Sequence, residues 1–318
     1  TFTGKFTNGS GLLNGSGKTL TLNNAAALTS GKSLGIASNV TLSSPAANVT
    51  GKTLAGAGTV SVTSLENTLG ANFSLITTTN VTASMTLSGT SEFTSSANLG
   101  DFVVTVGGTG TLTAHASATL PSGTGSFSVG SNVTLQLSAI HSDGLVATGA
   151  GTTDVLNLEN DLNADLSGIT TTTVTAALNA SGNPVLGASM KLGDFVVTTS
   201  GGSGTVTANA SANLTTGTGK FTLGTGTTLE ITAAHADGLT IDGAGSTRVL
   251  KLDETAGADL SNISSTGDAG TGNLVKADDN VTFTSTFPIK PFSLDGGKQI
   301  TMSTGGITTT EKVTVKTG

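Results

Sequence analysis

One segment of the chain occurs twice, and this repetition constrains the fold more than any other feature of the sequence. Residues 99–105 read LGDFVVT, and residues 192–198 read the same seven letters 93 positions later. After one inserted residue the offset becomes 94, because residues 141–145 (HSDGL) correspond to residues 235–239 (HADGL). The chain therefore contains at least two copies of one structural repeat.

A third, more diverged copy lies upstream. Residues 38–42 match residues 131–135 at a spacing of 93, and both read SNVTL. We therefore divide the chain into three tandem repeats and a divergent tail, which we expect to act as a cap or an assembly segment. The predicted boundaries are 1–98 for repeat 1, 99–191 for repeat 2, 192–285 for repeat 3 and 286–318 for the tail.

Within each repeat, short runs of β-forming residues alternate with polar ones and are separated by glycine-rich turns. Residues 17–22 (GKTLTL) and 132–137 (NVTLQL) are examples. Glycine pairs recur at the same steps in repeats 2 and 3, as Gly149 and Gly151 correspond to Gly243 and Gly245. We therefore expect an all-β chain that turns at equivalent places in every repeat.

Composition decides between two all-β architectures. Only 36% of the residues are hydrophobic, 3% are aromatic, and Trp, Tyr and Cys are absent. Tandem β-sandwiches need bulky side chains to fill a layer about 10 Å thick, whereas a solenoid interior accepts stacked Val, Leu, Ile, Ala and Thr. We predict a parallel β-solenoid, with tandem β-sandwich domains as the alternative. Coils of about 18 to 24 residues would give about 14 to 17 coils.

Three segments carry a resemblance to a known class of proteins. Residues 17–22, 235–245 and 258–263 resemble the β-strand repeats of large secreted bacterial surface proteins, which include repeat adhesins and surface-layer-like proteins. The resemblance implies a secreted protein at the cell surface, with an architectural role. The lack of cysteine and the Thr, Ser, Asn, Gly and Ala bias favour the same location.

Two His-x-Asp sequences are the most site-like constellation of side chains. His141 and Asp143 are two residues apart, as are His235 and Asp237, so each pair would lie on one face of a strand and could bind a metal. Both pairs precede a glycine, and Asp before Gly is common in turns. Repeat 1 has Thr50 in place of the aspartate, so we favour a structural corner over a ligand site.

A group of acidic residues suggests a second site. Carboxylate oxygens at the edge of a coil could bind calcium, and a solvated acidic face is the alternative, which we favour because the spacing matches no defined calcium loop. The candidate calcium ligands are Asp154, Glu159, Asp161, Asp165, Asp253, Glu254 and Asp259.

Several classes of function lack support in the sequence. Neither a Gly-x-Ser-x-Gly elbow nor a phosphate-binding glycine loop occurs, and Arg248 is the only arginine, so we expect no catalytic activity. The net charge of −7 and the lack of an aromatic platform argue against nucleic-acid binding. No apolar run approaches the length of a membrane span.

The charges are distributed unevenly along the chain. Residues 1–52 contain four lysines and no acid, and residues 53–190 contain eight acids and no base. In a solenoid this gives a positive end followed by a negative middle, which favours head-to-tail association. The first strand-like segment would then pair with another copy through its edge. The residues proposed for this assembly are Thr1, Phe2, Thr3, Lys5 and Phe6.

These observations lead to three hypotheses of function. The first is a non-catalytic extracellular protein that assembles with itself into a surface layer or fibre. The second is an adhesin whose solenoid binds glycans of a cell envelope or another surface. The third, which we rank last, is ice binding through rows of Thr-x-Thr pairs such as Thr111 and Thr113, because these pairs do not recur in every coil. None requires a cofactor, although calcium could take part.

Overall fold

The computed structural model describes residues 11–13, 17–22, 28, 31–214, 217–255, 258–267, 274–277, 281–283, 292–294 and 300–302. The chain is all-β, and its strands stack as a parallel β-solenoid of about 11 turns. The strand pairs run parallel, as in β6 with β8 and β17 with β19. Tandem sandwiches are built from antiparallel strands, so the solenoid prediction is confirmed and the alternative is wrong.

The strands are short, and most have three to six residues. Twelve strands lie between residues 11 and 179: β1 Gly11–Leu13, β2 Lys18–Thr21, β3 Ser33–Ile36, β4 Val40–Pro45, β5 Thr53–Thr63, β6 Ile76–Ser88, β7 Ser91–Phe93, β8 Val103–Ala114, β9 Ser126–Val129, β10 Val133–Ser138, β11 Ala147–Leu156 and β12 Ile169–Asn179. The strands after residue 179 are β13 Val185–Leu186, β14 Val196–Ser200, β15 Gly204–Ala208, β16 Lys220–Leu223, β17 Thr227–Thr232, β18 Thr240–Gly243, β19 Ser246–Leu250, β20 Leu274–Ala277, β21 Val281–Phe283, β22 Phe292–Leu294 and β23 Ile300–Met302.

Six single-turn helices interrupt the strands at positions related by the sequence repeat. The α-helices are α1 Ala46–Val49, α2 Ala139–Ser142 and α3 Ala233–Ala236, and the 3-10 helices are η1 Leu65–Asn67, η2 Leu158–Asn160 and η3 Leu252–Thr255. Both series advance by 93 and then 94 residues, which are the two offsets of the sequence repeat. The repeat therefore has a structural counterpart, although its exact boundaries stay a prediction.

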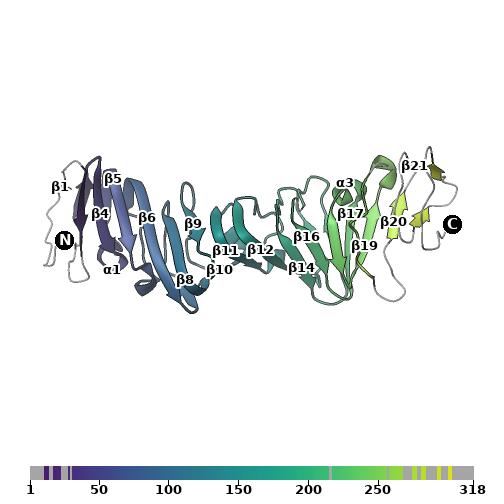
Figure 1. Cartoon of the computed structure of the whole chain (residues 1–318), viewed down its shortest axis with the longest axis horizontal. Coiled ribbons are helices and arrows are strands. Elements are labelled where there is room, and N and C mark those ends of the chain that lie inside the picture. The colour runs from purple at the N-terminus through teal and green to yellow at the C-terminus, as the bar shows by residue number, and fades with distance from the viewer. Residues whose placement is uncertain are drawn as a thin grey trace. The chain divides into compact units, whose positions relative to one another are not determined.

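The chain divides into two compact units. Unit 1 comprises Thr1–Leu137, Gly144–Asp154 and Gly168–Val174, and unit 2 comprises Ser138–Asp143, Val155–Ser167 and Thr175–Gly318. In unit 1, strands β1, β3, β5, β6 and β8 follow one another in a parallel sheet (Figure 1). In unit 2, strands β14, β16 and β18 lie in one sheet, and β13, β15, β17, β19, β20 and β22 lie in another.

Each coil takes 20 to 24 residues. The steps are 20 from Leu34 to Leu54, 23 from Val104 to Phe127 and 24 from Val197 to Phe221. The expected coil length is therefore right, but the expected number of about 14 to 17 coils is too high for a chain with about 11 turns. The difference arises because the coils are at the long end of the expected range and because parts of both chain ends lie outside the described residues.

Apolar side chains stack in columns from coil to coil. In unit 1, Leu34, Leu54 and Ile76 occupy paired positions and are all buried. In unit 2, Phe221 lies between Val197 and Ile241 in the same manner. Alternation of buried and half-buried residues in β4, β10 and β17 places every second side chain in the interior.

The interior also holds larger side chains than the sequence led us to expect. Six of the 11 phenylalanines are fully buried: Phe73, Phe93, Phe102, Phe127, Phe195 and Phe221. Two of these rings in unit 1, those of Phe73 and Phe102, have centroids 4.6 Å apart. Stacked rings therefore contribute to the core beside the aliphatic columns.

No helix in the described part of the chain is both long enough and apolar enough to cross a membrane.

Candidate functional site: the polar corner column

Polar residues stack at one corner of the coils, one residue per coil, and we call this series the corner column. In unit 1 it starts at Thr50, whose Oγ1 accepts a hydrogen bond from the backbone N–H of Asn72, 2.8 Å away in the next coil. Asn72 forms a parallel bridge to Asn98, and Asn98 forms another to Thr119. The corner column of unit 1 therefore consists of uncharged side chains.

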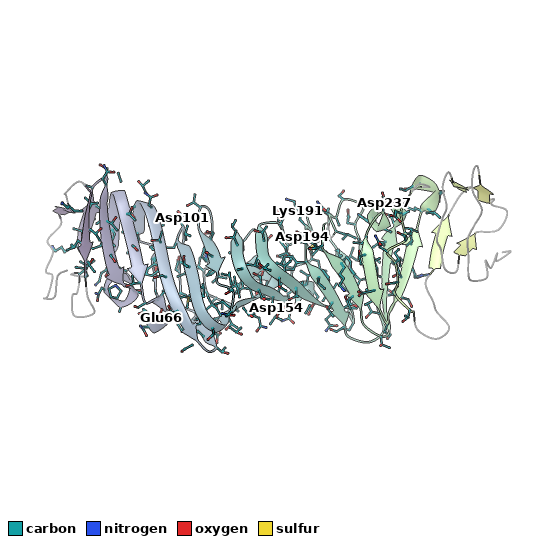
Figure 2. The ribbon with its side chains drawn as sticks, in the orientation of Figure 1. Glu66, Asp101, Asp154, Lys191, Asp194 and Asp237 are labelled. Atoms are coloured by element: carbon teal, nitrogen blue, oxygen red, sulfur yellow. The ribbon has the colours of Figure 1, made fainter. Side chains whose placement is uncertain are left out.

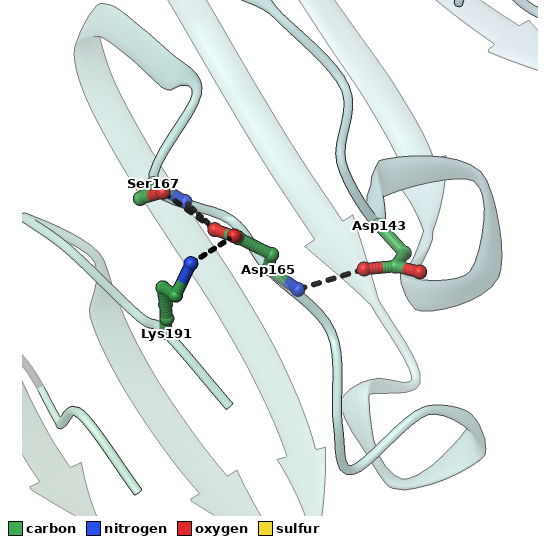
Figure 3. A network of polar contacts seen from close by, with 4 residues as sticks. All are labelled: Asp143, Asp165, Ser167 and Lys191. Carbon is green, nitrogen blue, oxygen red and sulfur yellow. Dashed lines mark hydrogen bonds and ion pairs between the residues drawn. The ribbon is translucent and has the colours of Figure 1, made fainter. Parts of the chain in front are cut away.

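In unit 2 the equivalent corner carries charge. Asp143 Oδ1 accepts a hydrogen bond from the backbone N–H of Asp165 at 2.8 Å (Figure 3). Asp165 bridges to Lys191, and Lys191 bridges to Asn213. One further step of the repeat brings the same contact back, because Asp237 Oδ1 accepts from the backbone N–H of Asp259 at 2.7 Å. The contact between Thr50 and Asn72 is thus repeated twice with aspartate in place of threonine.

Local sequence explains why the chain forms this corner. Thr50, Asp143 and Asp237 are the C-cap residues of α1, α2 and α3. A glycine with positive φ follows each of them, with φ of 65° at Gly51 and 70° at Gly238. Glycine adopts this conformation without a steric penalty and so ends a helix sharply. The helix end then directs the C-cap side chain toward the next coil.

Asp165 is the most connected member of the corner column. Its Oδ2 lies 2.6 Å from Lys191 Nζ, and its Oδ1 accepts hydrogen bonds from the backbone N–H and the hydroxyl of Ser167 (Figure 3). The ammonium group of Lys191, followed by the Ser167 hydroxyl, lowers the pKa of Asp165 below its ordinary value. Ion pair and hydrogen bonds together keep this carboxylate charged.

The histidines of the His-x-Asp sequences belong to helix starts. His141 donates its backbone N–H to the Ser138 hydroxyl at 3.4 Å, and its Nδ1 lies 3.1 Å from the same oxygen. His235 repeats both contacts with Thr232, and its Nε2 lies 3.1 Å from the carbonyl oxygen of Ala212. These contacts, with those of Asp143 and Asp237, are typical of the structural corner that the sequence favours over a ligand site.

Three of the candidate calcium ligands contact nitrogen donors. Asp154 Oδ2 accepts a hydrogen bond from the side-chain amide of Gln136 at 2.9 Å. Glu159 Oε2 accepts from the backbone N–H of Asn179 at 2.9 Å, and Asp161 accepts from that of Asn163 at 3.1 Å. The counterpart of Glu159 in repeat 1 is Glu66, which binds the backbone N–H of Thr86 at 3.1 Å.

The remaining candidates are placed in the corner column or in η3. Asp165 and Asp259 belong to the corner column, where Asp259 Oδ1 also accepts from the backbone N–H of Ser261 at 2.9 Å. Asp253 and Glu254 lie in η3, and Glu254 forms an ion pair with Lys251 at 2.9 Å. Among the described residues, no three His, Cys, Asp or Glu side chains are grouped to hold a metal ion.

Glu66 and Asp101 lie at opposite ends of the strands of unit 1 (Figure 2). Glu66 is in η1, directly after β5, and Asp101 is two residues before β8. The acidic residues of unit 1 are therefore spread over both edges of its sheet. The proposed assembly residues Thr1, Phe2, Thr3, Lys5 and Phe6 lie outside the described residues.

Two charged pairs were missed by sequence reasoning. One is Asp165 with Lys191, and the other is Lys220 Nζ with Asp242 Oδ2, 2.7 Å apart on the neighbouring strands β16 and β18. The Lys220 ammonium lowers the pKa of Asp242. The partners are 26 and 22 residues apart, so the coil length was the signal that could have paired them.

A third set of paired side chains changes its chemistry from repeat to repeat. Ser43 pairs with Ser61 in repeat 1, and at the equivalent positions of repeat 2 Gln136 donates to Asp154. In repeat 3 the same two positions hold Glu230 and Arg248, with Arg248 Nη1 2.9 Å from Glu230 Oε2.

Chemically, these side chains close the coils onto one another by accepting backbone N–H groups and forming exposed ion pairs. Comparison with models of protein families, with curated proteins and with solved structures gave no match for this chain.

Proposed function

We propose that the chain is a non-catalytic structural protein of an extracellular surface, and that it assembles with copies of itself into a layer or fibre. The observation that carries the proposal is the use of polar side chains described above. In both units, side chains that could bind a ligand instead accept the backbone N–H of the next coil, as Thr50 and Asp143 do. Such contacts support a scaffold.

The stacked coils also supply a means of assembly. A parallel solenoid presents open sheet edges at its ends, and an open edge is a template for a further strand. β1 is at the end of the described sheet order. The expected polarity of charge, with lysines in residues 1–52 and acids in residues 53–190, would orient one copy behind another.

Electron microscopy of the purified full chain, together with sedimentation over a range of concentrations, tests this proposal. We expect ordered fibres or sheets that become shorter or rarer as salt increases, because salt screens the charges. Monodisperse particles under all conditions would contradict the proposal. Deletion of residues 1–7 is expected to weaken assembly, and deletion of residues 312–318 is the matched control at the other terminus. Unchanged assembly after the first deletion would exclude the N-terminal segment as the contact.

An adhesin is the second candidate, and one exposed row of hydroxyl groups favours it. Ser84, Thr105, Ser128 and Thr148 occupy paired positions on four successive coils of unit 1 and point outward. Hydroxyl groups at the spacing of neighbouring strands, about 4.8 Å, could bind the hydroxyl groups of a glycan. Binding of monodisperse protein to immobilised cell-envelope glycans, lost in the variant Thr105→Lys and retained in Thr134→Lys on another strand, would support the adhesin over the layer or fibre.

A further inference from the structure

The corner column has the same geometry in both units but a different chemistry. Its members in unit 1 are uncharged: Thr50, Asn72, Asn98 and Thr119. Its members in unit 2 include five ionisable residues: Asp143, Asp165, Lys191, Asp237 and Asp259. The sequence repeat relates Asn72 to Asp165 and Asn98 to Lys191, so a neutral pair in one unit corresponds to an ion pair in the other.

A second ion pair differs between the units in the same way. Lys220 and Asp242 form their contact in unit 2 on adjacent strands. The equivalent positions one repeat earlier are Ser126 and Thr148, which belong to unit 1. The carboxylate corner at η1 and η2 provides a useful contrast, because Glu66 in unit 1 and Glu159 in unit 2 make the same contact. That corner therefore loads both units equally.

We infer that the charged corners make unit 2 an acid-sensitive part of the solenoid, which opens below about pH 4 while unit 1 stays closed. Opening here means loss of contact between successive coils of unit 2. The inference goes beyond the proposed function and does not depend on self-assembly.

The direction follows from the carboxylates that the fold keeps charged. The pKa of Asp165 is lowered by Lys191 and Ser167, that of Asp242 by Lys220, and that of Asp259 by the Ser261 hydroxyl and backbone N–H. A carboxyl group whose pKa is lower in the folded than in the unfolded chain stabilises the fold above its unfolded pKa of about 3.9. That stability is lost as the pH falls through the folded pKa.

The charged neighbours of these groups support the same direction. Asp143 faces Asp165 from the preceding coil and Lys191 faces it from the following coil. Lys220 faces Asp242 from the preceding coil. Asp237 faces Asp259 from the preceding coil, and the following coil at that position lies outside the described residues. Protonation of Asp165 and Asp242 would leave two lysines without their counter-charges.

Pepsin provides a direct test, because it cleaves opened chain in acid. The full chain is digested briefly at several values between about pH 5 and about pH 2.5, and the first cleavage sites are mapped by mass spectrometry. Both units contain buried phenylalanines at which pepsin can cut once a coil opens, such as Phe127 in unit 1 and Phe221 in unit 2. We expect the ratio of cleavage in unit 2 to cleavage in unit 1 to rise by about tenfold over this interval.

Variants built from the chain's own repeats provide the control. A neutral-corner variant carries D165N, K191N, K220S, D242T and D259N, each replaced by the residue at the equivalent place in unit 1. This variant should lose the rise in cleavage of unit 2. A reciprocal variant, N72D with N98K, places the ion pair in unit 1 and should transfer acid sensitivity to that unit.

Far-ultraviolet circular dichroism at neutral pH establishes that each variant is folded. Equal cleavage of both units in the unmodified protein would overturn the inference. An unchanged acid response of the folded neutral-corner variant would overturn it as well. If that variant does not fold, the reciprocal variant decides, and an unaltered acid response of unit 1 in N72D/N98K is the contradicting result.

Discussion

The side chain at the end of each short α-helix is defined by its contact more than by its residue type. Thr50, Asp143 and Asp237 differ in charge, yet each supplies one oxygen to a backbone N–H 22 residues later. A buried or partly buried N–H without an acceptor is costly. The requirement is therefore an oxygen at the right distance, which a hydroxyl or a carboxylate can meet.

This equivalence gives a prediction for Asp143. We expect D143A to lower the free energy of unfolding by about 1 kcal/mol, because the backbone N–H of Asp165 loses its acceptor. The variant D143T should retain most of the stability, since threonine makes this contact in repeat 1. Urea denaturation followed by circular dichroism measures both changes. Equal stability of D143A and the parent would show that the contact is unimportant.

Glycine at the bend within a coil gives a second prediction. Gly149 has φ of 117°, and a Cβ added there would collide with the backbone carbonyl oxygen of Val129 in the preceding coil. We expect G149A to cost about 2 kcal/mol or more in the free energy of unfolding. The control is G182A, because a Cβ at Gly182 meets open space. A G149A protein as stable as G182A in thermal denaturation would contradict the role of the close approach.

At the scale of the elements, the stacked interior columns hold successive strands together. Phe127 of β9 pairs with Val104 of β8 on one side and with Ala147 of β11 on the other, and all three are fully buried. A parallel sheet aligns like positions of successive coils, so a side chain contacts residues about 20 places before and after it. Interior packing is thus shared among neighbouring coils.

Removing one ring from this column should be expensive. We expect F127A to lower the free energy of unfolding by about 3 to 5 kcal/mol, because a phenyl-sized cavity remains between two coils. The exposed neighbour Val146, with 41% of its surface accessible, is the control, and V146A should change stability by less than about 0.5 kcal/mol. Chemical denaturation of both variants provides the comparison, and a loss below 1 kcal/mol for F127A would speak against the packed column.

The surface ion pairs between strands should contribute far less. Glu230 and Arg248 are 2.9 Å apart, and the side chain of Arg248 is 45% exposed. A double-mutant cycle with E230Q and R248Q is expected to give a coupling energy of about 0.2 to 1 kcal/mol that declines in high salt. A larger coupling that does not respond to salt would mean that the pair is effectively buried.

At the scale of the whole molecule, the short helices divide the solenoid into equivalent stretches. α1, α2 and α3 begin at Ala46, Ala139 and Ala233, and the spacing between them is the sequence repeat. Coils of 20 to 24 residues place about four coils in each stretch. Removing one whole stretch should therefore join positions that already match.

Deletion of residues 99–191 tests this expectation. Residue 98 then precedes residue 192, in the place that residue 191 held, and both Asn98 and Lys191 belong to the corner column. We expect this shorter chain to fold with a cooperative thermal transition and a β-rich circular dichroism spectrum. Deletion of residues 99–145, about half of a stretch, joins unlike faces and should give a chain without a cooperative transition. Similar behaviour of the two deletions would contradict the predicted repeat boundaries.

The sequence revealed the fold better than the contacts of its polar residues. Alternating β-formers, the 93-residue repeat and the shortage of bulky residues were sufficient to predict a parallel solenoid. The acidic residues were correctly identified as an edge feature, but Asp165 was grouped with Asp161 rather than with Lys191. Side-chain partners depend on coil length, which varies from 20 to 24 residues, and a single sequence does not reveal where the extra residues are inserted.

The paired positions on neighbouring strands carry a consequence for protein engineering. Serine with serine, glutamine with aspartate, and glutamate with arginine occupy one pair of sites in three copies within a single chain. Each copy is a double substitution that the fold has accepted. The chain thus contains its own small set of compatible residue pairs, from which further coils could be composed without any other sequence for guidance.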